Sequence, residues 1–184
     1  MNICNVFMKL FFPLWLASSL IGCIPSAGKE DAPLKEVIMR YNMLLAEGYR
    51  KLNMNPLQEV ATREQAEKLY FHMAAIGEGR LRLESTLKDI KFVKVVVGKD
   101  DQATAETKEI WDFTHIDINT GSKFAEEKDF IYEIGYTLKK LNGRWLITNV
   151  ATISGTSTNT VIPWPQIDRK GQLKRPVTPP VGHH

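Results

Sequence analysis

The sequence predicts an α+β domain in which N-terminal helices pack on a curved, four-stranded antiparallel sheet. Apolar residues recur at helical spacing between residues 34 and 76. Runs rich in β-branched and aromatic residues follow between residues 89 and 153. The pair Asn142-Gly143 separates the last two runs and is a strong signal of a β-hairpin. Helices followed by an antiparallel meander form two layers, with the helices on one face of the sheet.

The first helix is predicted to run for about 18 residues from Leu34, because its apolar positions form one stripe. The stripe consists of Leu34, Ile38, Tyr41, Leu45 and Leu52. Pro33 suits the first helical position, where its missing N–H would be unpaired anyway. Pro56 disfavours helix at the residue before it, and the following "LQEVA" is expected to form a short turn.

The second helix is predicted to begin after Thr62, which has the spacing of a capping box with Gln65. Gly77 and Gly79 are expected to end it. Its apolar face is predicted to contain Ala66, Leu69, Tyr70, Met73 and Ile76.

Four segments are predicted as strands: "DIKFVKVVVG", "TAETKEIWDFTHID", "FIYEIGYTL" and "RWLITNVATI". "GKDDQ" is expected to turn the first two, and "DINTGSKFAEEK" to connect the second and third. Residues 130–141 and 144–153 are predicted to be antiparallel neighbours. The pattern ends at Ser154, so residues 154–184 are predicted to be an extended, proline-rich, basic tail.

The N-terminus has the layout of a secretory signal peptide, predicted over residues 1–22. An apolar run from Leu10 to Ile21 follows Lys9. As a helix it would measure roughly 18 Å, short of the roughly 30 Å hydrocarbon core of a bilayer, so it is not a transmembrane anchor. Translation from Met8 is an alternative, because the segment from Met8 has the whole layout by itself.

The run ends at Cys23, and residues 20–23 resemble a bacterial lipobox. Leu20 supplies the apolar residue three before the cysteine, Ile21 follows, and the small Gly22 leaves a peptidase room to close on the bond. The resemblance implies a diacylglycerol on the Cys23 thiol, cleavage before Cys23, and an acyl chain on the new N-terminus. In the alternative interpretation, Cys23 is a buried cysteine after an uncleaved helix.

Lipidation at Cys23 predicts a protein held on a membrane of the cell envelope. Ile24 rather than aspartate follows the cysteine, which favours the outer membrane, facing the periplasm. Residues 23–33 are small, polar and bounded by prolines, so they are predicted to be the lipid anchor and tether before a domain at residues 34–153.

Composition excludes several classes of function. A net charge of +3 gives no dense basic face for nucleic acid. The two cysteines, Cys4 and Cys23, form neither a disulfide framework nor a metal site. No metal is expected, and the lipid on Cys23 is the sole non-protein group. The sequence contains no G-x-S-x-G, Walker, H-E-x-x-H or Rossmann motif, so no catalytic residue is predicted and the protein is expected not to be an enzyme.

Aromatic residues on the predicted strands form the candidate site. Strand alternation brings several to the concave side of a curved sheet, together with two polar residues. The candidate pocket consists of Glu109, Trp111, Phe113, His115, Tyr132, Tyr136 and Trp145. In the alternative interpretation the aromatics are core packing beneath the helices. Glu109 and His115 would be about 20 Å apart on one straight strand, too far for a catalytic dyad.

The last hairpin resembles the end of the nuclear transport factor 2-like superfamily, in the form found in the intermembrane-space domains of plastid division proteins and bacterial relatives. The residues that carry the resemblance are Tyr136, Gly143, Trp145, Ile147 and Val150. It implies a conical α+β shell that can enclose a pocket. The superfamily includes isomerases, dehydratases and noncatalytic interaction domains, and no catalytic Asp/Tyr or Asp/His set maps onto this chain.

We therefore expect a lipid-anchored envelope protein whose domain is a noncatalytic module for protein interaction or assembly, with an envelope protein as partner. The alternative is a protein that binds a small hydrophobic molecule or a lipid in the aromatic pocket. A cryptic isomerase or hydrolase using Glu109 or His115 is a third hypothesis.

Overall fold

The computed structural model describes residues 27–165 and confirms the predicted fold class. Two α-helices and a short 3-10 helix precede an antiparallel sheet of five strands. The elements are α1 (Ala27–Lys51), the 3-10 helix (Asn55–Glu59), α2 (Arg63–Glu78), β1 (Leu81–Val97), β2 (Gln102–Asp117), β3 (Lys123–Leu141), β4 (Arg144–Thr156) and β5 (Asn159–Ile162).

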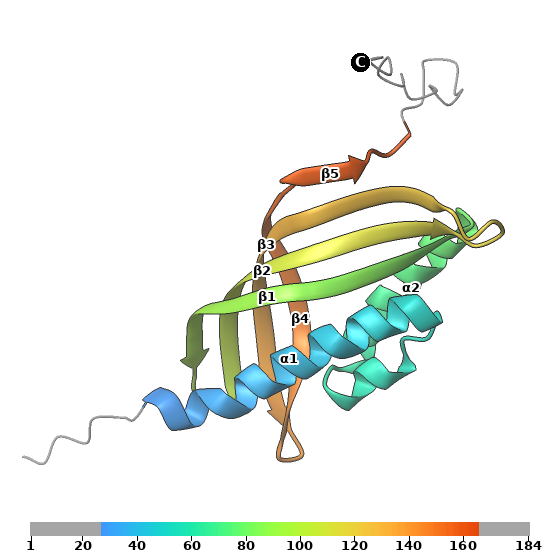
Figure 1. Cartoon of the computed structure of the whole chain (residues 1–184). Helices are drawn as coiled ribbons and strands as arrows, with labels where there is room; N and C mark the ends of the chain where they lie inside the picture. Colours follow the sequence, from blue (N-terminus) through green and yellow to red (C-terminus); the bar gives the residue numbers. More distant parts are fainter. Residues whose placement is uncertain (1–26, 166–184) are drawn as a thin grey trace, which may run out of the picture.

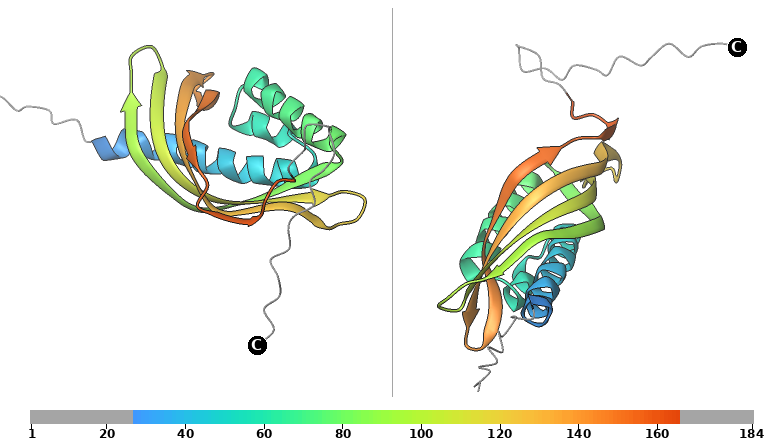
Figure 2. Two further views of the ribbon diagram at one scale, coloured as in Figure 1. Left: turned by 90° about the horizontal axis from the view of Figure 1, so that it is seen from above. Right: turned by 90° about the vertical axis from the view of Figure 1, so that its left-hand side faces the viewer.

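The sheet is strongly curved, and both helices lie on its concave side (Figures 1 and 2). Its strands follow the order β1-β2-β3-β4, and β5 pairs with the first part of β3. Each pairing between consecutive strands has two register shifts, such as the one between Trp111 and Phe113 on β2. Extra residues of this kind bend and twist a strand, which accounts for the curvature.

The hairpin predicted at Asn142-Gly143 is confirmed. Leu141 pairs with Arg144, and the two turn residues have positive φ angles of 50° and 80°. That left-handed backbone is what Asn and Gly tolerate best, and its twist matches that of the flanking strands.

The first helix begins at Ala27 rather than at Leu34, so Pro33 lies inside it instead of at its start. The segment predicted as tether is therefore partly helical. A proline removes one backbone hydrogen bond from a helix. The burial of Leu34 and Ile38, each 0% exposed, anchors the helix beyond the proline and offsets that loss. The short turn at "LQEVA" is confirmed as part of the 3-10 helix.

Several strand boundaries also differ from the predicted ones, and β4 continues to Thr156, inside the predicted tail. The first strand begins at Leu81, and the third begins at Lys123, inside the predicted connection. The strand β5 lies in the predicted tail. Its sequence has no apolar alternation, so the pattern did not predict it. Side-chain hydroxyls help hold it to β3, since Ser157, just before β5, and Thr160 both donate to the Glu127 carboxylate. Residues 166–184 lie outside the described part of the chain.

The main core fills the concave face beside the β3–β4 hairpin. Leu57, Leu138 and Ile147 are 0% exposed and pack with the buried stripe of α1. Burying one such side chain contributes about 1.5–3 kcal/mol. Farther from the hairpin, the same face carries polar side chains and a cavity. Within residues 27–165, no helix has the length and apolar content needed to cross a membrane.

Candidate functional site

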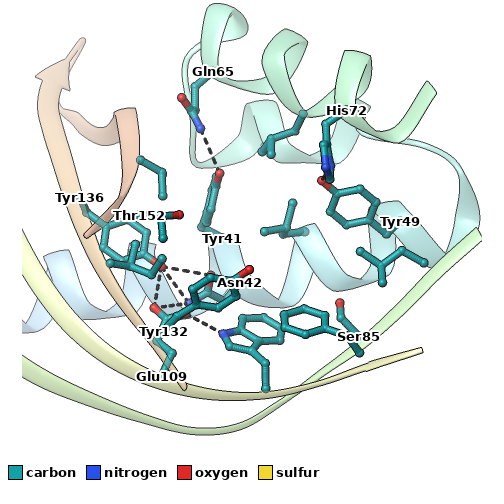
Figure 3. Close-up of a pocket in the computed structure, with 17 residues that line it drawn as sticks. Tyr41, Asn42, Tyr49, Gln65, His72, Ser85, Glu109, Tyr132, Tyr136 and Thr152 are labelled. Atoms are coloured by element: carbon teal, nitrogen blue, oxygen red, sulfur yellow. Dashed lines mark hydrogen bonds between the residues drawn. The ribbon is translucent and has the colours of Figure 1, made fainter. Parts of the chain in front are cut away.

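A cavity of about 370 Å³ lies between the two helices and the concave face of the sheet (Figure 3). Side chains from α1, α2 and strands β1 to β4 line it. Its walls are mostly apolar and aromatic, with Trp111 stacked on Phe113 at a ring-centroid distance of 5.9 Å and Tyr132 edge-on to Phe113. A concave, mainly apolar site of this size with a few polar groups is typical of small-molecule binding.

Glu109 occupies the floor of the cavity and is only 2% exposed. Its Oε1 atom accepts hydrogen bonds from Thr107 Oγ1 at 2.7 Å, the Tyr136 hydroxyl at 2.7 Å and Asn42 Nδ2 at 3.3 Å. Its Oε2 atom accepts one from Trp111 Nε1 at 2.8 Å. We call these five residues the floor network.

The floor network stabilises a buried carboxylate with neutral donors alone. Of the residues that line the cavity in the described chain, none is Lys or Arg. Burial raises the pKa of Tyr136 well above its ordinary value, and the charge of Glu109 and the hydrogen bond to it raise it further. The phenol therefore stays protonated and continues to donate to Glu109.

Tyr41 and Gln65 form a second polar group in the cavity, which we call the wall pair. Gln65 Nε2 donates to the Tyr41 hydroxyl at 3.2 Å, and the two side chains are 3% and 1% exposed respectively. The Oε1 atom of Gln65 is buried and has no hydrogen-bond partner in the described residues. Burial raises the pKa of Tyr41 to about 12, although the hydrogen bond from Gln65 lowers it in part.

The position of Gln65 follows from a half-formed capping box. Its backbone N–H donates to Thr62 Oγ1 at 3.4 Å, as predicted. Its side chain, however, turns into the cavity toward Tyr41 instead of back toward the N–H of Thr62.

A second difference on α2 concerns Tyr70, which was predicted on the apolar face of this helix but is 52% exposed.

The rim of the cavity is more polar and more exposed than its floor. His72 on α2 is exposed and lies with its Nδ1 atom 2.6 Å from the Tyr49 hydroxyl on α1. Thr152 on β4 is also exposed. The cavity therefore opens between α2 and β4.

Five of the seven candidate pocket residues come together in this cavity: Glu109, Trp111, Phe113, Tyr132 and Tyr136. Trp111 and Tyr136 are 4% and 2% exposed, so they are packed in the interior and also line the cavity.

Trp145 and His115 lie elsewhere. Trp145 stands at the start of β4, next to the hairpin, and borders a shallow surface groove with Pro33 and Arg144. His115 lies beside a register shift of β2 and packs against Trp164 with ring centroids 4.6 Å apart. Burial lowers the pKa of His115, and the charge of His72 lowers it further.

Sequence reasoning missed Asn42, Thr107 and Gln65. Two of them carried a signal. Asn42 occupies a stripe position four residues after Ile38, and Thr107 shares strand parity with Glu109 and Trp111. A polar residue at an inward position indicates a buried hydrogen bond. Gln65 gave no such signal, because its capping position explained it already.

Several predictions fall outside what the structure tests. Cys23 and the lipobox residues Leu20, Ile21 and Gly22 lie outside the described residues. Within residues 27–165, no group of three or more His, Cys, Asp or Glu side chains is arranged to hold a metal ion.

Comparison with known proteins shows the fold. No protein-family model matches the chain, and no curated protein matches it. The intermembrane space region of chloroplast protein ARC6 superimposes with a TM-score of 0.56 at 14% identity, covering 66% of this chain and 94% of that one. The chain thus shares its fold with that region, as the sequence resemblance predicted. At this identity the likeness concerns the fold alone.

Two further solved structures are similar with lower scores. A ketosteroid isomerase-like protein from Erwinia carotovora atroseptica has a TM-score of 0.46 at 14% identity, over 69% of this chain and 98% of that one. An NTF-2 like protein from Shewanella oneidensis has a TM-score of 0.35 at 14% identity, over 65% of this chain and 98% of that one.

Proposed function

We propose that this protein is a lipid-anchored protein of the cell envelope whose domain binds a small, mostly apolar molecule in the cavity without catalysing a reaction. The observation that carries the proposal is the aromatic-walled cavity above a floor whose polar atoms are already satisfied. Open apolar space of this kind is costly in a protein interior, where side chains normally pack without voids. A bound molecule would fill it.

The walls suit a flat, apolar ligand body. Phe113 packs edge to face against Tyr132, and Trp111, stacked on Phe113, extends the same surface. Removing apolar surface from water contributes about 25 cal/mol per Å², so a molecule enclosed here would gain most of its affinity from these rings.

The floor network supports binding rather than catalysis. A general base must reach the proton that it removes. Glu109 Oε1 already accepts three hydrogen bonds and Oε2 accepts one, so its lone pairs are largely engaged by the protein. His115, the other candidate base, packs against Trp164 outside the cavity.

Two observations support the location in the envelope. The sequence from Leu20 to Cys23 has the order of residues that lipidation requires. The region of chloroplast protein ARC6 that shares this fold is an intermembrane space region, so the same architecture is used beside a membrane there.

Native mass spectrometry of the full chain, isolated in its membrane and transferred to lipid nanodiscs, tests the proposal. We expect a retained small molecule. Leu69→Trp places an indole at the half-buried cavity wall of α2 and should abolish retention, whereas Lys68→Trp, at the exposed neighbouring position, should not. A ligand-free mass in the unaltered protein, or equal retention in both variants, would contradict the proposal.

A second candidate function is a protein-interaction module. It is favoured by Tyr70 and Phe71 on α2, which are 52% and 68% exposed and pack edge to face. Aromatic side chains are enriched at protein interfaces. Crosslinking in intact cells should capture one defined envelope protein, and Phe71→Glu should remove that product while Lys68→Glu retains it. Crosslinking unaffected by Phe71→Glu would rule out this surface.

A further inference from the structure

We infer that the ligand carries a neutral polar head group with both a hydrogen-bond donor and an acceptor, such as a primary amide or a hydroxyl, and that Gln65 and Tyr41 bind this head. The inference rests on the proposed function, because it assigns the chemistry of the molecule that occupies the cavity. Among the described residues, Gln65 Oε1 is the one buried side-chain oxygen that lacks a hydrogen-bond partner.

Gln65 supplies the acceptor. Its side chain lines the cavity, is 3% exposed, and leaves Oε1 without a hydrogen bond. Leaving a buried polar atom unsatisfied costs about 1–3 kcal/mol, and buried polar side-chain atoms in proteins nearly always have a partner. A donor on a bound ligand would provide that partner once the Gln65 amide turns its oxygen toward the open part of the cavity.

Tyr41 supplies the donor. Its hydroxyl oxygen accepts from Gln65 Nε2, and among the described residues nothing accepts its own hydrogen. The phenol remains protonated at neutral pH because burial raises its pKa to about 12. The wall pair therefore presents an acceptor and a donor side by side.

An amide or hydroxyl head matches the wall pair in either orientation of the Gln65 side chain. If the amide turned over, Tyr41 would donate to Gln65 Oε1 and Nε2 would be the free group. A head that both donates and accepts can bond to the free group in each case. With the Gln65 amide as described, a head that only donates or only accepts leaves either the Tyr41 hydrogen or Gln65 Oε1 without a partner.

Charge selects a neutral head. The buried carboxylate of Glu109 lies beneath the site, and the described cavity lining includes no Lys or Arg to stabilise an anion. An ammonium has no lone pair to accept the Tyr41 hydrogen. The oxygens of Glu109 already accept hydrogen bonds from the floor donors, so an ammonium here would also lack a direct hydrogen bond to that carboxylate.

Matched naphthalene probes test the head group. 2-Naphthamide, 2-naphthoate, 2-naphthylmethylammonium and 2-methylnaphthalene share one flat apolar body and differ in the group attached to it. The full chain in lipid nanodiscs is freed of any retained ligand and titrated with each probe by calorimetry, with empty nanodiscs as the blank. We expect 2-naphthamide to bind about tenfold more tightly than each of the other three, the gain of one well-placed pair of buried hydrogen bonds.

Two variants assign that preference to the wall pair. Gln65→Met keeps the length of the side chain and removes its polar atoms, and Tyr41→Phe removes only the hydroxyl. Each variant should bind 2-naphthamide about tenfold more weakly than the unaltered protein does. Its affinity for 2-methylnaphthalene should stay within about twofold, since the apolar contacts persist. The matched controls, Gln102→Met and Tyr70→Phe, change exposed positions outside the cavity and should alter neither probe.

The outcomes separate this inference from the function on which it rests. Binding of 2-methylnaphthalene as tight as that of 2-naphthamide, or tighter binding of a charged probe, would overturn the assignment of a neutral head while leaving a ligand cavity in place. Retained preference for the amide in both Gln65→Met and Tyr41→Phe would overturn the role of the wall pair. Absence of binding by all four probes, together with a ligand-free native protein, would instead overturn the proposed function.

Discussion

The floor network and the wall pair are both buried and polar, but they differ in how completely their hydrogen bonds are made. On the floor, each oxygen of Glu109 accepts at least one donor from the protein. On the wall, Gln65 Oε1 accepts none, and the Tyr41 hydrogen has no acceptor within the described residues. The two regions lie in one cavity and share the same aromatic surroundings.

The difference separates a structural role from a binding role. A buried charge requires hydrogen bonds in the folded state itself, so its donors must come from the protein. A neutral amide can bear an unmade bond at a smaller cost until a ligand makes it. Substitutions on the floor should therefore act on stability, and substitutions on the wall should act on binding.

Glu109→Ala should produce the largest effect. It leaves the indole N–H of Trp111 without an acceptor and opens a void at the centre of the network. We expect a loss of about 3 kcal/mol or more in the free energy of unfolding, from the unsatisfied donor and the void together. Urea denaturation followed by circular dichroism measures it.

The matched control is Glu106→Ala, an exposed carboxylate on the other face of the same strand. It should change the free energy of unfolding by less than about 0.5 kcal/mol. Glu109→Gln keeps the side-chain volume and one acceptor oxygen. Its free energy of unfolding should therefore lie between those of Glu109→Ala and Glu106→Ala. Equal stability of Glu109→Ala and the unaltered protein would show that the floor is not structural.

Tyr136→Phe should have an intermediate effect that depends on pH. At neutral pH it removes a hydrogen bond to a carboxylate, a loss of about 2 kcal/mol. The folded pKa of Tyr136 is raised, so its contribution is complete below the unfolded pKa of about 10 and declines as the pH rises above it. The unaltered protein should therefore lose stability more steeply above pH about 10 than the variant does.

Urea midpoints measured across that alkaline range check the prediction, with Tyr70→Phe as the exposed control. Burial also raises the pKa values of Tyr41, Tyr49 and Tyr132, so the variant keeps part of the alkaline decline. If the difference in stability between the unaltered protein and Tyr136→Phe widened above pH about 10, it would contradict a stabilising role of the protonated Tyr136 hydroxyl.

Sequence patterns predicted the fold and the floor network better than the wall pair. Asn142-Gly143 and the alternation of β2 are local signals, so they predicted the hairpin and the shared face of Glu109 and Trp111. The curvature that makes room for a cavity comes from register shifts, which depend on pairing between distant strands.

The same reason explains the individual differences. His115 was assigned to the pocket from strand parity alone, yet it packs against Trp164, a partner 49 positions further along the chain. Gln65 was explained by a local capping rule, whereas its side chain is positioned by Tyr41 on another helix. Contacts between residues far apart in the sequence are not reflected in its local periodicity, so the periodicity could not predict them.

Among the substitutions in the cavity, Gln65→Met should have the smallest effect on the free energy of unfolding, which tests the difference between the floor network and the wall pair most directly. Replacing Gln65 loses one hydrogen bond to Tyr41 but also removes the unsatisfied Oε1 atom. The two changes oppose each other, so we expect the free energy of unfolding of the ligand-free protein to shift by less than about 1 kcal/mol. With a retained ligand the variant should be clearly less stable than the unaltered protein, because a ligand that binds the folded state adds stability that grows with the logarithm of its affinity. Thermal unfolding of both proteins, with and without ligand, measures this difference, and a large loss in the ligand-free variant would place Gln65 with the structural floor network.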